Sequence, residues 1–208
     1  MNLKVKSQKS KTQGFTVIEM VIVVTIFSIV SAVVLFNTRN FSNSVSLNNL
    51  TQDIALMIRS VQVESVSGRY VGTEFLEAPS YGLYFETGVL DRSFVHFADF
   101  NNNKIYDGMA AGCGDDPGNE CLEIITLQEG YAIHCIEATV LDTGFGVTCS
   151  ADLDKYSITF TRPESYPTNT SSSFGGLKLY GDTHIIVRNQ NDETASIHLW
   201  PTGQVEVE

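Results

Sequence analysis

A single apolar segment near the N-terminus is the strongest constraint on this chain. Residues 15–36 are almost uninterrupted in apolar side chains. A helix of about 22 residues is roughly 33 Å long, which matches the hydrocarbon core of a bilayer. Glu19 interrupts the segment near its start. A carboxylate in hydrocarbon costs about 2.5–3.5 kcal/mol on insertion scales, so the segment predicts a membrane helix in which this acid has a specific role.

The flanks of the apolar segment argue against a cleaved secretory signal. Four lysines and no acidic residue precede Gly14, and such a leader favours a cytoplasmic N-terminus. A secretory signal places small residues and its cleavage site after the apolar core, whereas Gly14 comes before it and the segment continues to Arg39. The sequence therefore predicts a single-pass protein of the cytoplasmic membrane, with the N-terminus inside and the rest outside.

The basic leader, Gly14, the residues from Phe15 to Glu19 (FTVIE) and the apolar helix together resemble the signal of type IV prepilins and type II secretion pseudopilins. In that family a membrane peptidase cleaves after the glycine, and the new N-terminus is methylated. The resemblance implies cleavage between Gly14 and Phe15 and N-methylation of Phe15. It also implies that Glu19 serves assembly, because the terminal amine of a neighbouring subunit would neutralise the buried carboxylate. The alternative is a plain membrane anchor with a stray acid.

A second helical pattern follows the apolar segment. Its apolar stripe consists of Leu47, Leu50, Ile54, Met57, Ile58 and Val61. Gly68 is a suitable C-cap, so one helix is expected over residues 15–67. The resemblance implies an α+β, pilin-like fold with a leader at 1–14, a membrane or filament-core helix at 15–36, an amphipathic continuation at 37–68 and a β-rich head at 69–208. Residues 53–69 resemble, more loosely, the H-type minor pseudopilin group.

Beyond Gly72 the apolar period changes from near 3.6 to 2, which predicts an antiparallel β-sheet packed on the helix. The expected strands are residues 81–85, 93–98, 122–127, 131–136, 156–161, 177–180, 184–188, 196–200 and 204–207. Strand 93–98 is apolar at both odd and even positions, so we expect both of its faces to be buried. Residues 168–176 (TNTSSSFGG) show neither period and are expected to form a mobile loop.

The charge of the chain bears on its partners. The formal net charge is −11, and removal of the four leader lysines would leave −15. The cations after Arg39 occur singly, and the chain has 24 acids, so no basic patch is available for phosphate contacts. Nucleic-acid binding, including a role in DNA uptake, is therefore disfavoured. No Gly-x-Ser-x-Gly nucleophile elbow is present, and we do not expect an enzyme.

Cysteine and histidine usage predicts disulfides and no transition-metal site. The cysteines are Cys113, Cys121, Cys135 and Cys149, an even set in the exported part of the chain. Of the three possible connectivities we favour 113–121 with 135–149, because each closes a short loop. A zinc site is the alternative, but no Cys-x-x-Cys pair exists. The histidines are His96, His134, His184 and His198, and we expect half-buried strand residues that lie apart from one another.

One loop has the oxygen spacing of a calcium site. Residues 99–108 (DFNNNKIYDG) follow a predicted strand. The candidate ligands at loop positions 1, 3, 5, 7 and 9 are Asp99, Asn101, Asn103, the Ile105 carbonyl and Asp107. The match is partial, because Lys104 replaces the position-6 glycine and Ala110 replaces the position-12 glutamate. Asp115, Asp116 or Glu120 could supply another carboxylate. The alternative is a turn in which Asp and Asn cap their own backbone without an ion.

The function that these patterns favour is structural. We expect a minor subunit of a type IV pilus or type II secretion pseudopilus, processed by prepilin peptidase and assembled with other pilin subunits by an inner-membrane platform. The resemblance implies these partners. The possible cofactor is Ca²⁺. A single-pass, membrane-anchored extracytoplasmic binding domain is the alternative function.

Overall fold

The computed structural model describes residues 14–68, 79–88, 91–108, 113, 119–149, 153–163, 166–171 and 178–208, with the side chains of residues 36–42 and 178 excepted. The predicted leader lies outside these residues except for Gly14. The chain divides into two compact units, Met1–Ser42 and Asn43–Glu208, and the boundary falls inside the long helix.

The helix α1 spans Val17–Ser67 and is 51 residues long, two residues shorter at its start than predicted. It ends as expected at Gly68, whose φ of 70° is left-handed. The Gly68 N–H donates to the carbonyl of Glu64 at 3.2 Å, which satisfies one of the last helical carbonyls. Glycine adopts this conformation without a Cβ penalty, and this explains why the helix stops here.

Within the second unit, one stripe of α1 forms the centre of the core. Leu47, Ile54, Ile58 and Val61 are each at most 3% exposed, as the 3–4 spacing predicts. Polar side chains also join the helix to the sheet. The hydroxyl of Ser65 donates to the carbonyl of Phe160 at 2.6 Å, and the guanidinium of Arg59 donates to the carbonyl of Val205 at 2.8 Å. Buried polar groups next to the apolar stripe are therefore paired.

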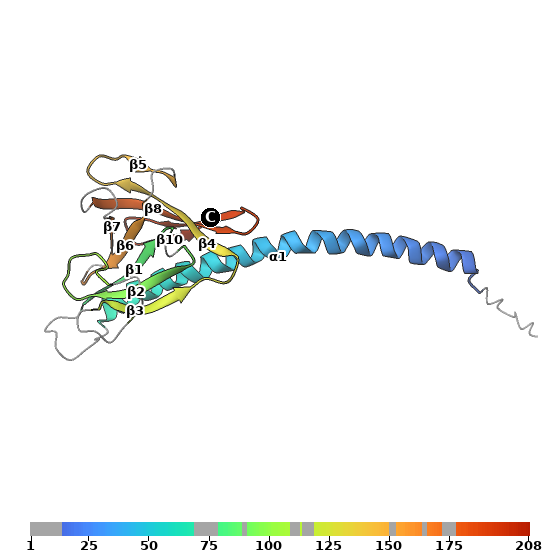
Figure 1. Ribbon diagram of the computed structural model, residues 1–208, viewed down its shortest axis with the longest axis horizontal. Helices are drawn as coiled ribbons and strands as arrows, with labels where there is room; N and C mark the ends of the chain where they lie inside the picture. The colour runs from blue at the N-terminus through green and yellow to red at the C-terminus, as the bar shows by residue number, and fades with distance from the viewer. Residues whose placement is uncertain are drawn as a thin grey trace, which may run out of the picture. The chain divides into compact units, whose positions relative to one another are not determined.

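The head is a ten-stranded sheet in which every pairing is antiparallel. The strands are β1 (Ser80–Glu86), β2 (Ser93–Asp99), β3 (Cys121–Thr126), β4 (Tyr131–Val140), β5 (Gly146–Val147), β6 (Lys155–Phe160), β7 (Pro167–Ser171), β8 (Lys178–Asn189), β9 (Thr194–Leu199) and β10 (Val205–Val207). Figure 1 shows them beside the C-terminal half of α1. The predicted α+β fold is confirmed.

The sheet branches at β8. The main order is β10-β9-β8-β7-β6-β1-β2-β3, and β4 pairs with both β8 and β5. One edge of β8 pairs with β4, while the other pairs first with β7 and then with β9. Because β8 is 12 residues long, it can serve both halves of the sheet. The two separate strands predicted at 177–180 and 184–188 are therefore one strand.

Strand β2 is buried on both faces, as predicted. Phe94 and Ala98 belong to the main core, whereas Val95 and Phe97 belong to a second cluster with Tyr84, Tyr106 and Cys121. The Tyr106 ring lies 5.4 Å from that of Phe97 and 4.9 Å from that of Tyr84, measured between centroids. The loop after β2 thus folds back over the outer face of the sheet, where its side chains are fixed by aromatic packing.

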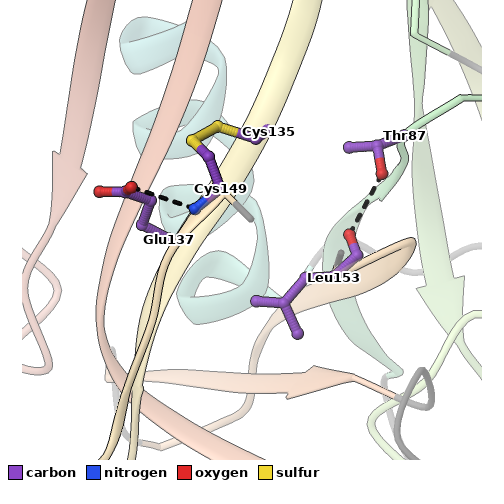
Figure 2. Close-up of a disulfide and its surroundings, with 5 residues drawn as sticks. All are labelled: Thr87, Cys135, Glu137, Cys149 and Leu153. Atoms are coloured by element: carbon purple, nitrogen blue, oxygen red, sulfur yellow. Dashed lines mark hydrogen bonds between the residues drawn. A yellow bond between two sulfur atoms is a disulfide. The ribbon is translucent and has the colours of Figure 1, made fainter. Parts of the chain in front are cut away.

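Two disulfides join the pairs that the sequence favoured. Cys113 bonds to Cys121, and Cys135 bonds to Cys149. The second links β4 to the segment after β5, where the Cys149 N–H donates to Oε1 of Glu137 at 3.2 Å (Figure 2). The Thr87 hydroxyl donates to the carbonyl of Leu153 at 3.3 Å, which joins the turn after β1 to the residues that precede β6 (Figure 2).

The prediction of a loop at residues 168–176 is wrong for its first four residues. Residues 168–171 lie in β7, and residues 172–176 lie outside the described residues. Asn169, Thr170 and Ser171 are each at most 2% exposed, although the segment has no apolar residue. The Asn169 amide donates to the carbonyl of Gly181 at 3.0 Å and to Oγ1 of Thr183 at 3.2 Å. Side-chain hydrogen bonds therefore take the place of apolar burial in this strand.

Candidate functional site

The candidate cleavage region lies outside the helix. Gly14, Phe15 and Thr16 are non-helical and exposed, and α1 begins at Val17. Thr16 is the N-cap, because its Oγ1 accepts a hydrogen bond from the Glu19 N–H at 3.3 Å. The bond between Gly14 and Phe15 is thus free of helical hydrogen bonds, and an exposed, irregular backbone is what a peptidase requires.

Glu19 occupies the first turn of α1. A carboxylate there interacts favourably with the positive end of the helix dipole. Thr16 and Glu19 also have the Thr-x-x-Glu spacing of a capping box, a pattern that is visible in the sequence. The acid therefore has a local role in starting the helix, in addition to any role between subunits.

The first part of α1 has an apolar surface on all sides. Among the described residues, Val17–Leu35 is long and apolar enough to cross a membrane, and none of its 18-residue window is buried. Two of its hydroxyl groups bond to the backbone of the same helix. The hydroxyl of Thr25 donates to the carbonyl of Val21 at 2.7 Å, and that of Ser28 donates to the carbonyl of Val24 at 2.8 Å. Such internal pairing is how hydroxyl groups are accommodated in an apolar environment.

Comparison with known families bears on this region. Residues 9–35 match the family model of the prokaryotic N-terminal methylation motif. This is the N-terminal motif of type IV pilins and pseudopilins. Neither the curated proteins nor the solved structures that were searched gave a match. The match spans the end of the leader and the apolar helix, and the head lies outside it. The pilin motif implies processing by prepilin peptidase and assembly with other pilin subunits, and it is consistent with membrane anchoring.

The loop at 99–107 in the head is organised around the Asp99 carboxylate, which is buried at the end of β2. Its Oδ1 accepts from the Asn103 N–H at 3.1 Å, and its Oδ2 accepts from the Lys104 N–H at 3.0 Å. Lys104 has φ of 67°, so it adopts the left-handed conformation that glycine has at position 6 of a calcium loop. The sharp turn therefore forms despite the lysine.

The structure brings the predicted calcium ligands of this loop together. Oδ2 of Asp107 accepts from the side-chain amides of Asn101 at 2.7 Å and Asn103 at 2.6 Å. Oδ1 of Asn103 accepts from the Ile105 N–H at 2.8 Å. These bonds match the capped turn that was the alternative to an ion site. The carboxylates of Asp99 and Asp107 also face the same loop.

Glu120 adds a third carboxylate. It is 2% exposed, and its Oε2 accepts from the Asp107 N–H at 2.9 Å. Burial raises the pKa of Glu120 to about 7, helped by the negative charges of Asp99 and Asp107 and opposed by the hydrogen bond from the Asp107 N–H. Asp99 has a cation beside it, because Nζ of Lys104 lies 3.9 Å from its Oδ2. Of the three extra carboxylates that the sequence offered, Glu120 reaches the loop, while Asp115 and Asp116 lie outside the described residues, as does Ala110.

The sequence predicted that the four histidines lie apart from one another, but two of them are in contact. His134 is exposed on β4, and Nε2 of His96 lies 3.1 Å from Oε2 of Glu64 on the helix. The rings of His184 and His198 are stacked, with centroids 4.0 Å apart. The expectation was wrong because β8 and β9 pair in a register that places these two residues directly opposite each other.

Proposed function

We propose that this chain is a minor subunit of a type IV pilus or type II secretion pseudopilus that is cleaved between Gly14 and Phe15 and assembled through its N-terminal helix. The observation that carries the proposal is the apolar surface around Val17–Leu35, in which the acid of the first turn is the single charged residue. An apolar surface of this size must be covered by lipid or by other proteins. The helix of a filament subunit would be covered by lipid while the subunit is in the membrane and by other subunits once it is in the fibre core.

The local geometry supports the processing step. Gly14 has no heavy atom within 4 Å of the position that a Cβ would take, and Phe15 is 76% exposed. Cleavage would turn Phe15 into the new N-terminus, directly before the N-cap Thr16. Two positive features, the free amine and the helix dipole, would then meet at one end of the helix. A carboxylate from Glu19 of a neighbouring subunit would neutralise this charge in the absence of water.

The test separates assembly from helix capping. Glu19→Gln removes the charge and retains the size of the side chain, whereas Thr16→Ala removes the capping acceptor and retains the charge. We expect Glu19→Gln to abolish incorporation into sheared filaments, while Thr16→Ala reduces it at most severalfold. Both variants should still be cleaved, and mass spectrometry of each product should identify an N-methylated Phe15.

Three results would contradict the proposal. An intact leader on the native product would exclude the pilin pathway. A terminus other than Phe15 would exclude the cleavage site. Normal filament incorporation of Glu19→Gln would exclude the charge pairing. Membrane retention without filament incorporation of the wild-type chain would instead favour the alternative, a single-pass anchor for an extracytoplasmic binding domain.

We infer a second property, that the loop at 99–107 binds Ca²⁺. Asp99, Asp107 and Glu120 bring three carboxylates to one small loop, and Lys104 forms an ion pair with Asp99 at 3.9 Å. The buried Glu120 feels the negative charges of Asp99 and Asp107. The side-chain oxygens of Asn101 and Asn103 and the carbonyl of Ile105 complete a set of hard oxygen ligands. Calcium binding would require the carboxylate of Asp107 to exchange its two amide donors for the ion.

Calorimetric titration of the full-length chain in detergent micelles with Ca²⁺ tests this inference. We expect binding in the millimolar range or tighter for the wild type, at least tenfold weaker binding for Glu120→Gln, and no change for Asp142→Asn. Asp142 is exposed in the turn after β4 and serves as the matched control. Absence of binding heat at millimolar Ca²⁺ would leave the loop as a capped turn without an ion.

A further inference from the structure

A second group of potential metal ligands lies on strands β8 and β9 of the head. One ligand atom from each of Asp182, His184 and His198 lies within 4.8 Å of the other two. Oδ1 of Asp182 and Nε2 of His198 are in hydrogen-bond contact. The side chain of His198 is only 6% exposed, whereas that of Asp182 is 39% exposed. The group is therefore anchored on one side and open to solvent on the other.

The strand register explains why these residues meet. Asp182 and His184 are two residues apart on β8, so they lie on the same face. His184 is the direct partner of His198 on β9. Thr183 and Ile185, the residues on either side of His184, are fully buried on the core face. The two histidines and the aspartate therefore lie on the face of the sheet opposite to α1, on rigid backbone rather than on a loop.

We propose that Asp182, His184 and His198 form a binding site for a divalent transition-metal ion, with Zn²⁺ as the representative ligand. Imidazole nitrogens suit Zn²⁺, Cu²⁺ and Ni²⁺, whereas Ca²⁺ prefers oxygen ligands alone. The stacked rings and the adjacent carboxylate provide two nitrogens and one oxygen, and water would complete the coordination. The metal would take the place of the proton between Nε2 of His198 and the Asp182 carboxylate.

The residues need to move little to form this site. Zinc binds imidazole nitrogen at about 2.0–2.1 Å and carboxylate oxygen at about 2.0–2.2 Å, so ligand atoms of one ion lie roughly 3–3.5 Å apart. The three ligand atoms now lie within 4.8 Å of one another, and side-chain rotation would bring them to the shorter spacing. The exposed Asp182 has the freedom to rotate, while the buried His198 serves as the fixed ligand.

A different cluster with similar residues cannot provide the same site. His134, Cys135 and Cys149 also place their ligand atoms within 4.8 Å of one another. However, the two cysteines form a disulfide and offer no thiolate. His134 therefore stands alone there, and it provides a matched control on a neighbouring strand.

The chain contains its own reporter for this site. Trp200 is the single tryptophan, and its ring lies 4.1 Å from that of His198 between centroids. A paramagnetic ion such as Cu²⁺ or Ni²⁺ bound by His198 would quench Trp200 fluorescence at this distance. Zn²⁺ is not a quencher of this kind, and it would compete with Ni²⁺ and restore the emission.

The experiment uses the full-length chain without a polyhistidine tag, in detergent micelles with saturating Ca²⁺ to occupy oxygen-ligand sites. We expect saturable quenching by Ni²⁺ with a stoichiometry of one, reversal by Zn²⁺ or by a chelator, and tighter binding of Cu²⁺ than of Ni²⁺. His184→Gln should weaken binding at least tenfold, and Asp182→Asn should weaken it severalfold. His134→Gln should bind like the wild type.

Two results would overturn the proposal. One is a wild-type chain whose Trp200 emission is unaffected by Cu²⁺ and Ni²⁺ up to millimolar concentration. The other is a His184→Gln variant that binds as tightly as the wild type. Since His184 is only half-buried, its variant is expected to fold, and an unchanged thermal unfolding midpoint would verify this. Direct titration of Zn²⁺ by calorimetry checks the same affinities without the fluorophore.

Discussion

Glu120 should make the folded protein less stable as the pH rises from about 4.5 to 7. In the folded state burial and the charges of Asp99 and Asp107 raise its pKa from 4.5 to about 7. Between these values the folded protein holds a proton that the unfolded chain has released. Rising pH therefore favours unfolding: the stabilisation is complete below pH 4.5 and is lost as the pH passes through 7.

The magnitude follows from the two pKa values. A tenfold change in proton affinity corresponds to about 1.4 kcal/mol, so the shift is worth ~3 kcal/mol across this range. Solvent screening does not reduce it much, because Glu120 is 2% exposed. Glu120→Gln retains the acceptor for the Asp107 N–H and removes the titrating proton. The variant should therefore lose about 3 kcal/mol of pH dependence relative to the wild type.

Urea unfolding of the full-length chain in detergent micelles, followed by circular dichroism at pH 5 and pH 8 with a chelator present, measures this difference. Glu123→Gln, an exposed change on β3, should retain the wild-type dependence. Addition of Ca²⁺ should flatten the dependence of the wild type, because a bound cation favours the ionised carboxylate. Parallel pH profiles for the wild type and Glu120→Gln would refute the reasoning.

Two further predictions concern the stability of the head. Gly82→Ala would place a Cβ 2.6 Å from the Ile158 carbonyl and from the Phe97 ring, so we expect a loss of about 1–3 kcal/mol in chemical denaturation; Gly146→Ala, which has open space, should be neutral. Replacing both Cys135 and Cys149 by serine opens a loop with a sequence separation of 14, and the unfolding free energy should fall by about 3 kcal/mol. A midpoint unchanged by either replacement would contradict the corresponding packing or loop-entropy argument.

The long helix and most strands were predictable because the spacing of their apolar residues indicates which face is buried. The stripe from Leu47 to Val61 and β2, which has apolar residues on both faces, are examples. Strand β7 was not predictable in this way, because its buried residues are polar. Thr170 is 1% exposed and donates to the carbonyl of Lys104 at 2.7 Å, far away in the sequence. A period-2 pattern of apolar residues cannot detect a strand whose burial depends on hydrogen bonds to remote backbone.

Two parts of the candidate sites depended on tertiary structure. Glu120 joins the loop at 99–107 because β3 pairs beside β2, and this pairing brings residue 120 to the end of the preceding strand. The histidine pair did have a sequence signal: His184 and His198 are equidistant from Asn191, and a hairpin centred there pairs them. The signal was missed because the turn contains no glycine, and its left-handed residue is Asp192 with φ of 60°.

The two roles of Glu19 can be combined in one physical account. In the uncleaved chain Phe15 has a neutral peptide nitrogen, and the Glu19 carboxylate lies at the positive end of the helix dipole, while its backbone N–H is capped by Thr16. The proposed cleavage would add a positive charge beside the same helix end, and in an apolar environment that charge would require a carboxylate within a few ångströms. If each carboxylate paired with its own amine, this charge pair would contribute nothing to the association of subunits. The proposed filament therefore depends on pairing in which the carboxylate of one subunit meets the terminal amine of another.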